Sequence, residues 1–591
     1  MKGATVPEIQ ATSWSKSAQV NISSEELWDL MWRPETQPRW LGEGPAIRLE
    51  RDTRCALTDE AGIWRSGYVE KIRSPSGVTL HMEPPPAWGD AGPTTVRIRI
   101  AAMAERKSRV EIEEADVPAA RVSEVERYWS RRLGLIRAMA TAVNRRRDQV
   151  KQAVVVIHGI GEQQPGATLA SLAASGVLPH GEEGESIWVK PDRASHSFEL
   201  RKMTYKASFQ NRLPSTDVFE FYWAHTIRDT TLGQLGAWMR RLLLRRRVPR
   251  PLRPLWLMSW VLIIAAAAMG VAVWIGAIDL SRWLVGGTAL VVIVGAVWKL
   301  IGRGLALQVL GDAARYLLPL PGNIAHRQAI REAGVELLER LHDSGEYDRV
   351  VILGHSLGSV IAYDIVTHAW IRMNTRHQRP RTAKFAELRD VERSVAVSGT
   401  EAARKLQHAA WRRQRANTQP WLVTDLVTVG SPLTYADLLM AAGPEALAEA
   451  KRDRILPTCP PVTEREASTG HLRMSYERPF RDALGGTKLT FTQFHHAAPF
   501  AVTRWTNLYF QTKWFGIAGD IVGGPVAGCF GDWVRDVALT SPAHRFTHTW
   551  YWRPAGDSAH LAALRDALAL DGRPDLVELL REVPAYSLIG K

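Results

Sequence analysis

A pentapeptide in the second half of the chain, Gly354-His355-Ser356-Leu357-Gly358, has the G-x-S-x-G spacing of a nucleophile elbow. The run from Tyr347 to Leu353 before it predicts a buried strand, and residues 359–366 after it predict a helix. A turn that lifts a serine above a sheet leaves no space for side chains at the two flanking glycines. We therefore predict that Ser356 is the nucleophile of an acyl-transfer reaction and that the Leu357 N–H donates to the oxyanion.

An earlier segment predicts the other side of the same site. Residues 153–157 form an uninterrupted apolar run that ends in His158-Gly159-Ile160-Gly161. Such a run is typical of a buried parallel strand, whose C-terminal end is the edge where α/β sheets place their sites. We expect the backbone N–H of Ile160 or Gly161 to be the second oxyanion donor, although a His-Gly pair after a strand also occurs as a plain tight turn.

A serine nucleophile on this kind of sheet is followed along the chain by its acid and then by its histidine. Two further strands are predicted, at 422–429 and 501–510. After the second strand, Asp520 lies in a glycine-rich loop and His548 lies among aromatic residues. We predict Asp520 as the acid that orients an imidazole and His548 as the general base.

Other assignments of the acid remain open. Asp425, Asp532 and Asp536 are rivals, and of these Asp425 and Asp536 fall inside predicted strands with less access to a site loop. The plain alternative is that Asp520 only forms a turn and that His548 only packs against its aromatic neighbours.

These motifs together resemble the DDHD-type and related bacterial serine hydrolases of the α/β-hydrolase superfamily. The matching segments are HGIG, GHSLGSVIAYDI, VGSPL, the Asp520 loop and H-x-x-Tyr-Trp, within residues 152–161, 323–368, 421–435 and 501–552. The resemblance implies a triad of Ser356, Asp520 and His548 that hydrolyses carboxylic esters, such as lipid or phospholipid acyl esters, through an acyl-enzyme. The Asp520 loop reads GDIVGG where the family has Asp-Pro-Val-Ala.

No cofactor or metal is predicted. The histidines lack an H-E-x-x-H or comparable spacing, and the chain has no G-x-x-x-x-G-K-[ST] phosphate loop. The three cysteines lie far apart and form no C-x-x-C pair, which excludes a disulfide framework and a cysteine zinc site. They are Cys55, Cys459 and Cys529.

The predicted fold class for residues 148–591 is α/β, an α/β-hydrolase fold with a mostly parallel sheet, interrupted by a transmembrane helical hairpin at 255–301. Residues 255–278 are 24 residues without a charge, which as a helix exceeds the roughly 30 Å hydrocarbon core. A second apolar stretch covers 283–298. Basic residues flank the pair, so the positive-inside rule places both folded domains in the cytoplasm. The alternative is a buried helical pair.

Residues 1–147 predict a separate α+β domain. A helix can begin at Ser23 or Ser24, alternating strands are predicted near 77–82 and 95–100, and a long helical pattern closes the unit at 123–144. This order resembles the START-like SRPBCC superfamily, a helix-grip fold in which a curved antiparallel sheet wraps a helix around an apolar cavity. The resemblance implies binding of a lipid or hydrophobic ligand; the alternative is a domain that only packs, regulates or assembles.

The charge of the chain is concentrated in two segments. The 75 Lys and Arg exceed the 61 Asp and Glu by 14, and residues 240–253 carry +7 while residues 372–415 carry +8, so the remainder sums to 14 − 15 = −1. We predict that 372–420 is a basic, lid-like insertion over the active site and that the partner is an anionic membrane surface rather than nucleic acid. A solvated basic face is the alternative for the insertion. An inactive, membrane-anchored lipid-binding or tethering protein is the alternative function, and no oligomeric state is predicted.

Overall fold

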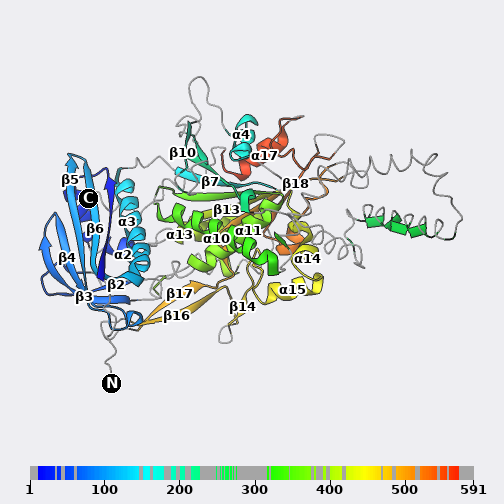
Figure 1. Cartoon of the computed structure of the whole chain (residues 1–591). Helices are drawn as coiled ribbons and strands as arrows, with labels where there is room; N and C mark the ends of the chain where they lie inside the picture. Colours follow the sequence, from blue (N-terminus) through cyan, green and yellow to red (C-terminus); the bar gives the residue numbers. More distant parts are fainter. Residues whose placement is uncertain are drawn as a thin grey trace.

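The computed structural model contains two folded units joined in one chain (Figure 1). It describes residues 11–33, 36–41, 47–58, 63–144, 151–159, 164–178, 188–192, 200–205, 215–226, 316–317, 321–344, 346–373, 379–380, 391–393, 400–414, 421–466, 470–481, 488–512, 519–541, 546–555 and 558–570, together with 194, 248 and scattered positions between 253 and 275.

The N-terminal unit is a six-stranded antiparallel sheet that wraps around one long helix. The strands lie in the order β1-β6-β5-β4-β3-β2, and every neighbouring pair is antiparallel. Its elements are β1 (Ala11–Val20), α1 (Ser24–Trp32), α2 (Gln37–Leu41), β2 (Arg54–Thr58), β3 (Ile63–Arg73), β4 (Gly77–Met82), β5 (Thr94–Ala104), β6 (Lys107–Pro118) and α3 (Val122–Asn144). The helix-grip arrangement predicted for this unit is confirmed by this order.

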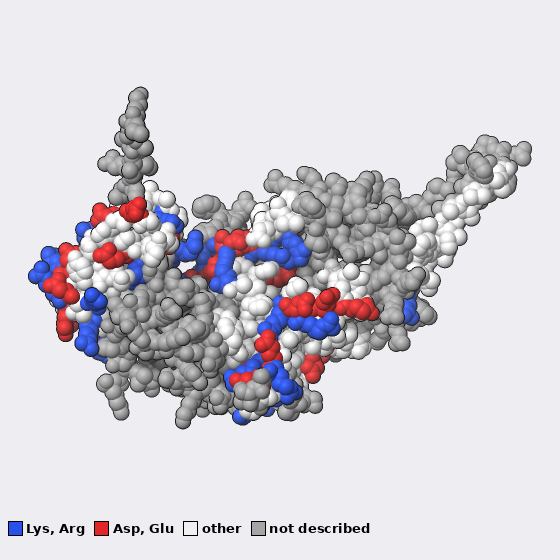
Figure 2. Space-filling view, turned by 90° about the horizontal axis from the view of Figure 1, so that it is seen from below, with Lys and Arg blue, Asp and Glu red and all other residues white. Residues whose placement is uncertain are grey.

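Local sequence explains why these elements form. Ser23 and Glu26 make a capping box that starts α1, because each side chain accepts from the other residue's backbone N–H. Along β4, buried and half-buried residues alternate, as expected for a strand with one face on the core. α3 lies across the concave face and buries Trp129, Leu133 and Ile136. On the face seen in Figure 2, basic and acidic side chains are interleaved over this unit.

The second unit is built on an eight-stranded mixed sheet with the order β19-β18-β13-β11-β7-β10-β9-β8. The six strands from β19 to β10 are parallel, whereas β9 and β8 join the edge antiparallel. The strands are β7 (Lys151–Ile157), β8 (Trp188–Pro191), β9 (Arg201–Tyr205), β10 (Ser215–Phe221), β11 (Arg349–His355), β13 (Val423–Val429), β18 (Arg504–Phe510) and β19 (Arg535–Leu539). In the register, Gly354 of β11 lies opposite Ile157 of β7 and Thr428 of β13.

Helices cover both faces of this sheet (Figure 1), so its central strands β11 and β13 are buried along their whole length. One face packs on α10 (Pro321–Asp343), α11 (Leu357–Met373) and α13 (Thr400–Gln414), and the other on α4 (Ala167–Ala174) and α17 (Ala559–Ala567). The remaining elements are small: α14 (Ala436–Leu439), α15 (Pro444–Arg452), α16 (Ala527–Phe530), the ladder β14 (Glu464–Arg465) with β15 (Leu472–Arg473), and the sheet of β12 (Arg379–Pro380), β17 (Lys488–Phe494) and β16 (Ser475–Arg481).

The two units contact each other through α3 and the end of α10. Gly134 of α3 lies so close to α10 that a Cβ atom on it would be 1.9 Å from the carbonyl oxygen of Asp343. Arg131 lies 4.0 Å from the Asp343 carboxylate, and Arg137 lies 3.4 Å from that of Glu346. Since residues 343–346 directly precede β11, the N-terminal unit contacts the second unit on the side where the parallel strands begin.

The prediction of a transmembrane hairpin at 255–301 is wrong for the part of the chain that the structure describes. No helix there has both the length and the apolarity that crossing a bilayer requires. The described positions between Arg253 and Val271 are helical and Ile275 lies in a turn, while 276–301 lie outside the described residues. A charge-free run indicates apolar side chains, but spanning needs a continuous helix of about 20 residues. The fold class is further corrected by the two antiparallel edge strands, which make the sheet mixed.

The lid-like insertion predicted at 372–420 is described mainly through α13. This helix buries Ala403, Arg404 and Trp411, and Arg404 donates to the Trp505 carbonyl at 3.0 Å, near the start of β18. Arg404 therefore packs against the sheet at the strand-start edge, because its guanidinium satisfies a backbone carbonyl, whereas the next residue, Lys405, is exposed. The rest of the insertion lies largely outside the described residues.

Candidate active site

The nucleophile lies in a strained turn between β11 and α11. Ser356 has a φ of 54°, in the left-handed region that non-glycine residues seldom occupy. A Cβ at Gly354 would be 2.5 Å from the Cα of Ser359, and a Cβ at Gly358 would be 2.3 Å from the carbonyl oxygen of His158. Both glycines are therefore required by close backbone contacts, as the elbow motif predicts.

Ser356, His548 and Asp520 form one hydrogen-bonded chain. The Nε2 atom of His548 lies 2.8 Å from the Oγ of Ser356, and its Nδ1 atom lies 3.0 Å from both carboxylate oxygens of Asp520. A carboxylate accepts, so Nδ1 carries the proton and Nε2 is free to accept from the serine hydroxyl. The structure thus brings together the three residues assigned to the triad, although 164 residues separate the serine from the acid.

The carboxylate of Asp520 is fully buried and accepts several hydrogen bonds. Its Oδ1 accepts from the backbone N–H of Val522 at 2.9 Å and of Gly523 at 3.0 Å, and its Oδ2 accepts from the hydroxyl of Tyr551 at 2.7 Å. Burial by itself would raise the pKa of Asp520, but the adjacent His548 and these donors outweigh it and lower the pKa below its ordinary value. Asp520 therefore stays ionised beside the imidazole.

Tyr551 and Gly430 are two residues of the site to which the sequence reasoning gave no role. The Tyr551 hydroxyl also accepts from the Phe510 N–H at 3.1 Å, so it joins the acid to the end of β18. Gly430 has a φ of 57°, and a Cβ on it would lie 2.9 Å from Asp520 Oδ2 and 3.2 Å from His548 Cε1. Both residues lie in segments that the sequence analysis quoted, Tyr551 three residues after the base in H-x-x-Tyr-Trp and Gly430 at a strand end in VGSPL.

The His158-Gly159 turn at the end of β7 lies directly against the nucleophile. A Cβ on Gly159 would be 2.9 Å from the Cβ of Ser356. His158 stacks on Trp223 with ring centroids 5.1 Å apart, and the indole N–H of Trp223 donates to the His158 carbonyl at 3.0 Å. Burial is the main reason that the pKa of His158 falls to about 4, so this ring is neutral and serves to hold the turn.

The predicted oxyanion donors are only partly described. Leu357 is the first residue of α11, so its N–H belongs to the first turn, where helical N–H groups have no intrahelical partner. Ile160 and Gly161 lie outside the described residues. Gly159, which directly precedes them, contacts Ser356. A second oxyanion donor is needed beside this serine.

Two of the three rival acids, Asp425 and Asp536, have other partners. Asp425 forms a bidentate ion pair with Arg504, at 2.8 and 2.9 Å, and Asp536 accepts from Asn507 and from the backbone N–H groups of Val526 and Ala527. Among the described residues, no group of three or more His, Cys, Asp or Glu side chains is arranged to hold a metal ion. The contacts of His548 with Ser356 and Asp520 can support proton transfer and nucleophilic attack by Ser356.

No family model and no curated protein matches the chain. Among solved structures, CalU16 from Micromonospora echinospora is similar at 20% identity over 22% of this chain and 78% of that one, with a TM-score of 0.19. The Aha1 dimer from Colwellia psychrerythraea shows 9% identity over 22% and 96%, with a TM-score of 0.19. PFC0360w, an HSP90 activator from Plasmodium falciparum, shows 15% identity over 18% and 74%, with a TM-score of 0.16. These neighbours have START-like helix-grip folds, and each match covers about a fifth of this chain.

Proposed function

We propose that the chain is a serine hydrolase that cleaves carboxylic esters. The observation that carries this proposal is the contact of His548 with Ser356 on one side and Asp520 on the other, at 2.8 and 3.0 Å, with the serine in a strained elbow. A structural serine needs neither the strain nor a buried imidazole with its far nitrogen held by a carboxylate. The geometry therefore favours a nucleophile with its base and orienting acid.

The proposed reaction follows from these positions. His548 Nε2 removes the Ser356 hydroxyl proton as Oγ attacks the ester carbonyl, and the ionised Asp520 stabilises the resulting imidazolium. The oxyanion is held by the backbone N–H of Leu357 and by that of Ile160 or Gly161. The imidazolium then protonates the leaving alcohol, and water, deprotonated by the same imidazole, releases the acid and regenerates Ser356.

The substrate class proposed within this reaction is an acyl ester of a lipid. It is supported by the resemblance of the GHSLG and VGSPL segments to DDHD-type hydrolases and by the apolar rings near the base, such as Phe546, which stacks on His548 with centroids 5.8 Å apart. An anionic membrane surface stays a prediction from charge, since residues 227–247 lie outside the described residues.

A lipid-binding protein without catalysis is the second candidate, because the N-terminal unit has the helix-grip arrangement. The interior of that unit is less suited to an apolar ligand than the resemblance implies. Arg65 and Glu114 form an ion pair with fully buried side chains, and Trp129 of α3 donates to Glu114 at 2.6 Å. A buried charged network opposes an apolar ligand beside it, since the charges are stable only with their present partners. We therefore favour the hydrolase.

The decisive experiment is labelling of the purified chain with a fluorophosphonate probe, together with turnover of short and long acyl esters. Replacing Ser356→Ala should abolish labelling and lower kcat by a factor on the order of 10⁴ to 10⁶. Ser344→Ala, at the end of α10 on the strand-start side, is the matched control and should label like the wild type. Labelling that persists in a folded Ser356→Ala protein would refute the proposal.

A further inference from the structure

The residue before the nucleophile, His355, is the last residue of β11 and is buried. The G-x-S-x-G pattern places no demand on this position, since any side chain satisfies the x. In the structure its Nε2 atom lies 2.9 Å from the backbone carbonyl oxygen of His548. A carbonyl only accepts, so Nε2 carries the proton and donates. The nucleophile strand thus holds the main chain of the proposed base directly.

The other ring nitrogen of His355 faces the glycine turn. Its Nδ1 atom is buried and has no hydrogen-bond partner among the described residues. A Cβ on Gly159 would lie 2.9 Å from this atom, which shows that the ring and the turn are in close contact. Burial, and next the neighbouring His548, lower the pKa of His355 to about 3, so the ring is neutral near pH 7 and keeps Nε2 as its donor.

The base loop surrounds the same ring. Trp552 contacts it edge-on with ring centroids 4.8 Å apart, Tyr551 lies at 5.9 Å, and the His548 ring lies at 5.0 Å. His355 therefore links three segments of the site: it ends the strand that leads to Ser356, and it contacts the loop that carries the base and the turn at Gly159. These segments come from parts of the chain nearly 400 residues apart.

We propose that His355 is a positioning residue that fixes the His548 main chain relative to Ser356 through its Nε2–H. This inference rests on the proposed serine hydrolase function. The imidazole of His548 must keep hydrogen-bond distance to Ser356 while its proton moves, and a displacement of about 1 Å in such a pair is enough to lower the rate by about 10²-fold. The hydrogen bond to the carbonyl removes one way in which the base loop can shift. Trp552 and Tyr551 then keep the His355 ring itself in place.

Two substitutions separate the hydrogen bond from simple packing. His355→Phe keeps a planar ring and loses the donor, whereas His355→Gln replaces the ring by an amide whose N–H group can reach the same carbonyl. We expect kcat of the Phe variant to fall by roughly 10- to 100-fold with KM within about threefold, and the Gln variant to recover most of that loss. His355→Leu serves in place of Phe if the latter does not fold.

A buried histidine elsewhere in the same unit provides the control. His495 also places its Nε2 2.9 Å from a carbonyl, that of Val462, and accepts from the Ala497 N–H, but contacts none of the triad residues. His495→Phe should lower stability without changing kcat per folded molecule. Rates should be normalised to the folded fraction measured by thermal unfolding, and the rate of fluorophosphonate labelling should be followed in parallel.

Two results would overturn the positioning role: a folded His355→Phe protein with the kcat and labelling rate of His495→Phe, or a His355→Gln protein as slow as His355→Phe. Either result leaves the hydrolase proposal intact as long as Ser356→Ala abolishes labelling. If Ser356→Ala retains labelling, the function itself fails, so the two failures are distinguishable.

Discussion

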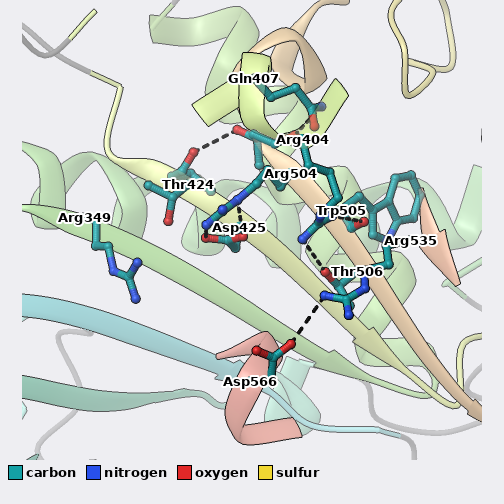
Figure 3. A network of polar contacts seen from close by, with 12 residues as sticks. Arg349, Arg404, Gln407, Thr424, Asp425, Arg504, Trp505, Thr506, Arg535 and Asp566 are labelled. Carbon is teal, nitrogen blue, oxygen red and sulfur yellow. Dashed lines mark hydrogen bonds and ion pairs between the residues drawn. The ribbon is translucent and has the colours of Figure 1, made fainter. Parts of the chain in front are cut away.

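Two buried aspartates lie at opposite edges of the same sheet, and one pairs with an imidazole while the other pairs with a guanidinium. Asp520, at the edge where the parallel strands end, faces an imidazole that can gain or lose a proton. Asp425, near the start of β13, is paired with the guanidinium of Arg504, with Arg404 and Arg349 nearby (Figure 3). Both carboxylates have a pKa below the ordinary value. A lowered pKa therefore does not by itself mark the catalytic acid.

The two hydrogen-bond networks differ in whether they can transfer a proton. In the strand-start network the donors already have protein acceptors: Arg404 donates to the Trp505 carbonyl and to Thr506 Oγ1, each at 3.0 Å, as Figure 3 shows. A guanidinium stays charged at any ordinary pH, so the Arg504 ion pair cannot transfer a proton. At the other edge the chain of hydrogen bonds ends on the hydroxyl of Ser356, which can react. The Asp425–Arg504 ion pair can therefore contribute only to stability, whereas the Asp520 carboxylate acts through His548 on a hydroxyl that can react.

The largest effect is expected from removing the charge of Asp520. Asp520→Asn places an amide beside the His548 Nδ1, and the wrong tautomer or orientation of the ring should lower kcat by about 10⁴-fold near pH 7. Steady-state ester turnover by the folded variant checks this. A loss smaller than about tenfold would mean that another group orients the base.

The matching substitution at the other edge should act on stability instead. Asp425→Asn leaves the buried guanidinium of Arg504 without its anion, which should lower the free energy of unfolding by about 3–5 kcal/mol. Denaturant unfolding measures this, and kcat per folded molecule should stay within about threefold. Asp29→Asn, which breaks an exposed pair with Arg33, is the control and should change stability by less than about 1 kcal/mol. The comparison fails if Asp425→Asn lowers kcat as strongly as Asp520→Asn.

A third aspartate, Asp217 at the strand-start edge, should make the free energy of unfolding depend on pH. Burial would raise its pKa, but Lys151, Lys202 and Tyr347 lower it from 3.8 to about 2. A carboxyl with a depressed folded pKa stabilises above its unfolded pKa, and that contribution is lost as the pH falls from about 4 through about 2. It should amount to roughly 2 kcal/mol. Unfolding free energies between pH 5 and 2 should therefore fall less steeply for Asp217→Asn than for the wild type, and equal slopes would refute the assignment.

The smallest effect is expected at the tyrosine that donates to the triad acid. Tyr551→Phe keeps the ring that stacks on Phe510 but removes the donor to Asp520, so we expect kcat to fall by about tenfold. Tyr435→Phe is the matched control, because its hydroxyl donates at 2.8 Å to the Ile521 carbonyl beside the acid loop and not to the carboxylate. Equal rates in the two variants would show that the Tyr551 hydroxyl only supports packing.

Local patterns predicted the parts of the site that depend on local chemistry. The elbow depends on five consecutive residues. Chain order, the glycine-rich loop and the aromatic neighbours led to Asp520 and His548, and the structure brings His548 into contact with both Asp520 and Ser356. No pattern indicated that Tyr551 would donate to Asp520 or that His355 would hold the His548 carbonyl. Those contacts depend on the packing of segments from different parts of the chain, which residue types and spacing do not specify.

Composition was a weaker guide than motif. The apolar run at 255–278 predicted a membrane span from hydropathy alone, whereas a span also requires a continuous helix, and none is found in the described ranges. Net charge likewise suggested a surface role for α13. One of its basic residues, Arg404, is buried and donates to a backbone carbonyl, whereas Lys405 is exposed, so the surface role stays a prediction. The antiparallel edge strands β8 and β9 carried no signal that distinguished them from parallel ones.

The close approach of Gly134 to the Asp343 carbonyl has a consequence for how the whole chain unfolds. The Asp343 carbonyl oxygen occupies the space that a side chain at position 134 would need, so α3 cannot slide along α10 without breaking this contact. The same helix, α3, packs on the N-terminal sheet and on the second unit. The two units are thus coupled mechanically. We expect them to melt in a single transition in calorimetry, and we expect Gly134→Val, by forcing the helices apart, to split that transition into two.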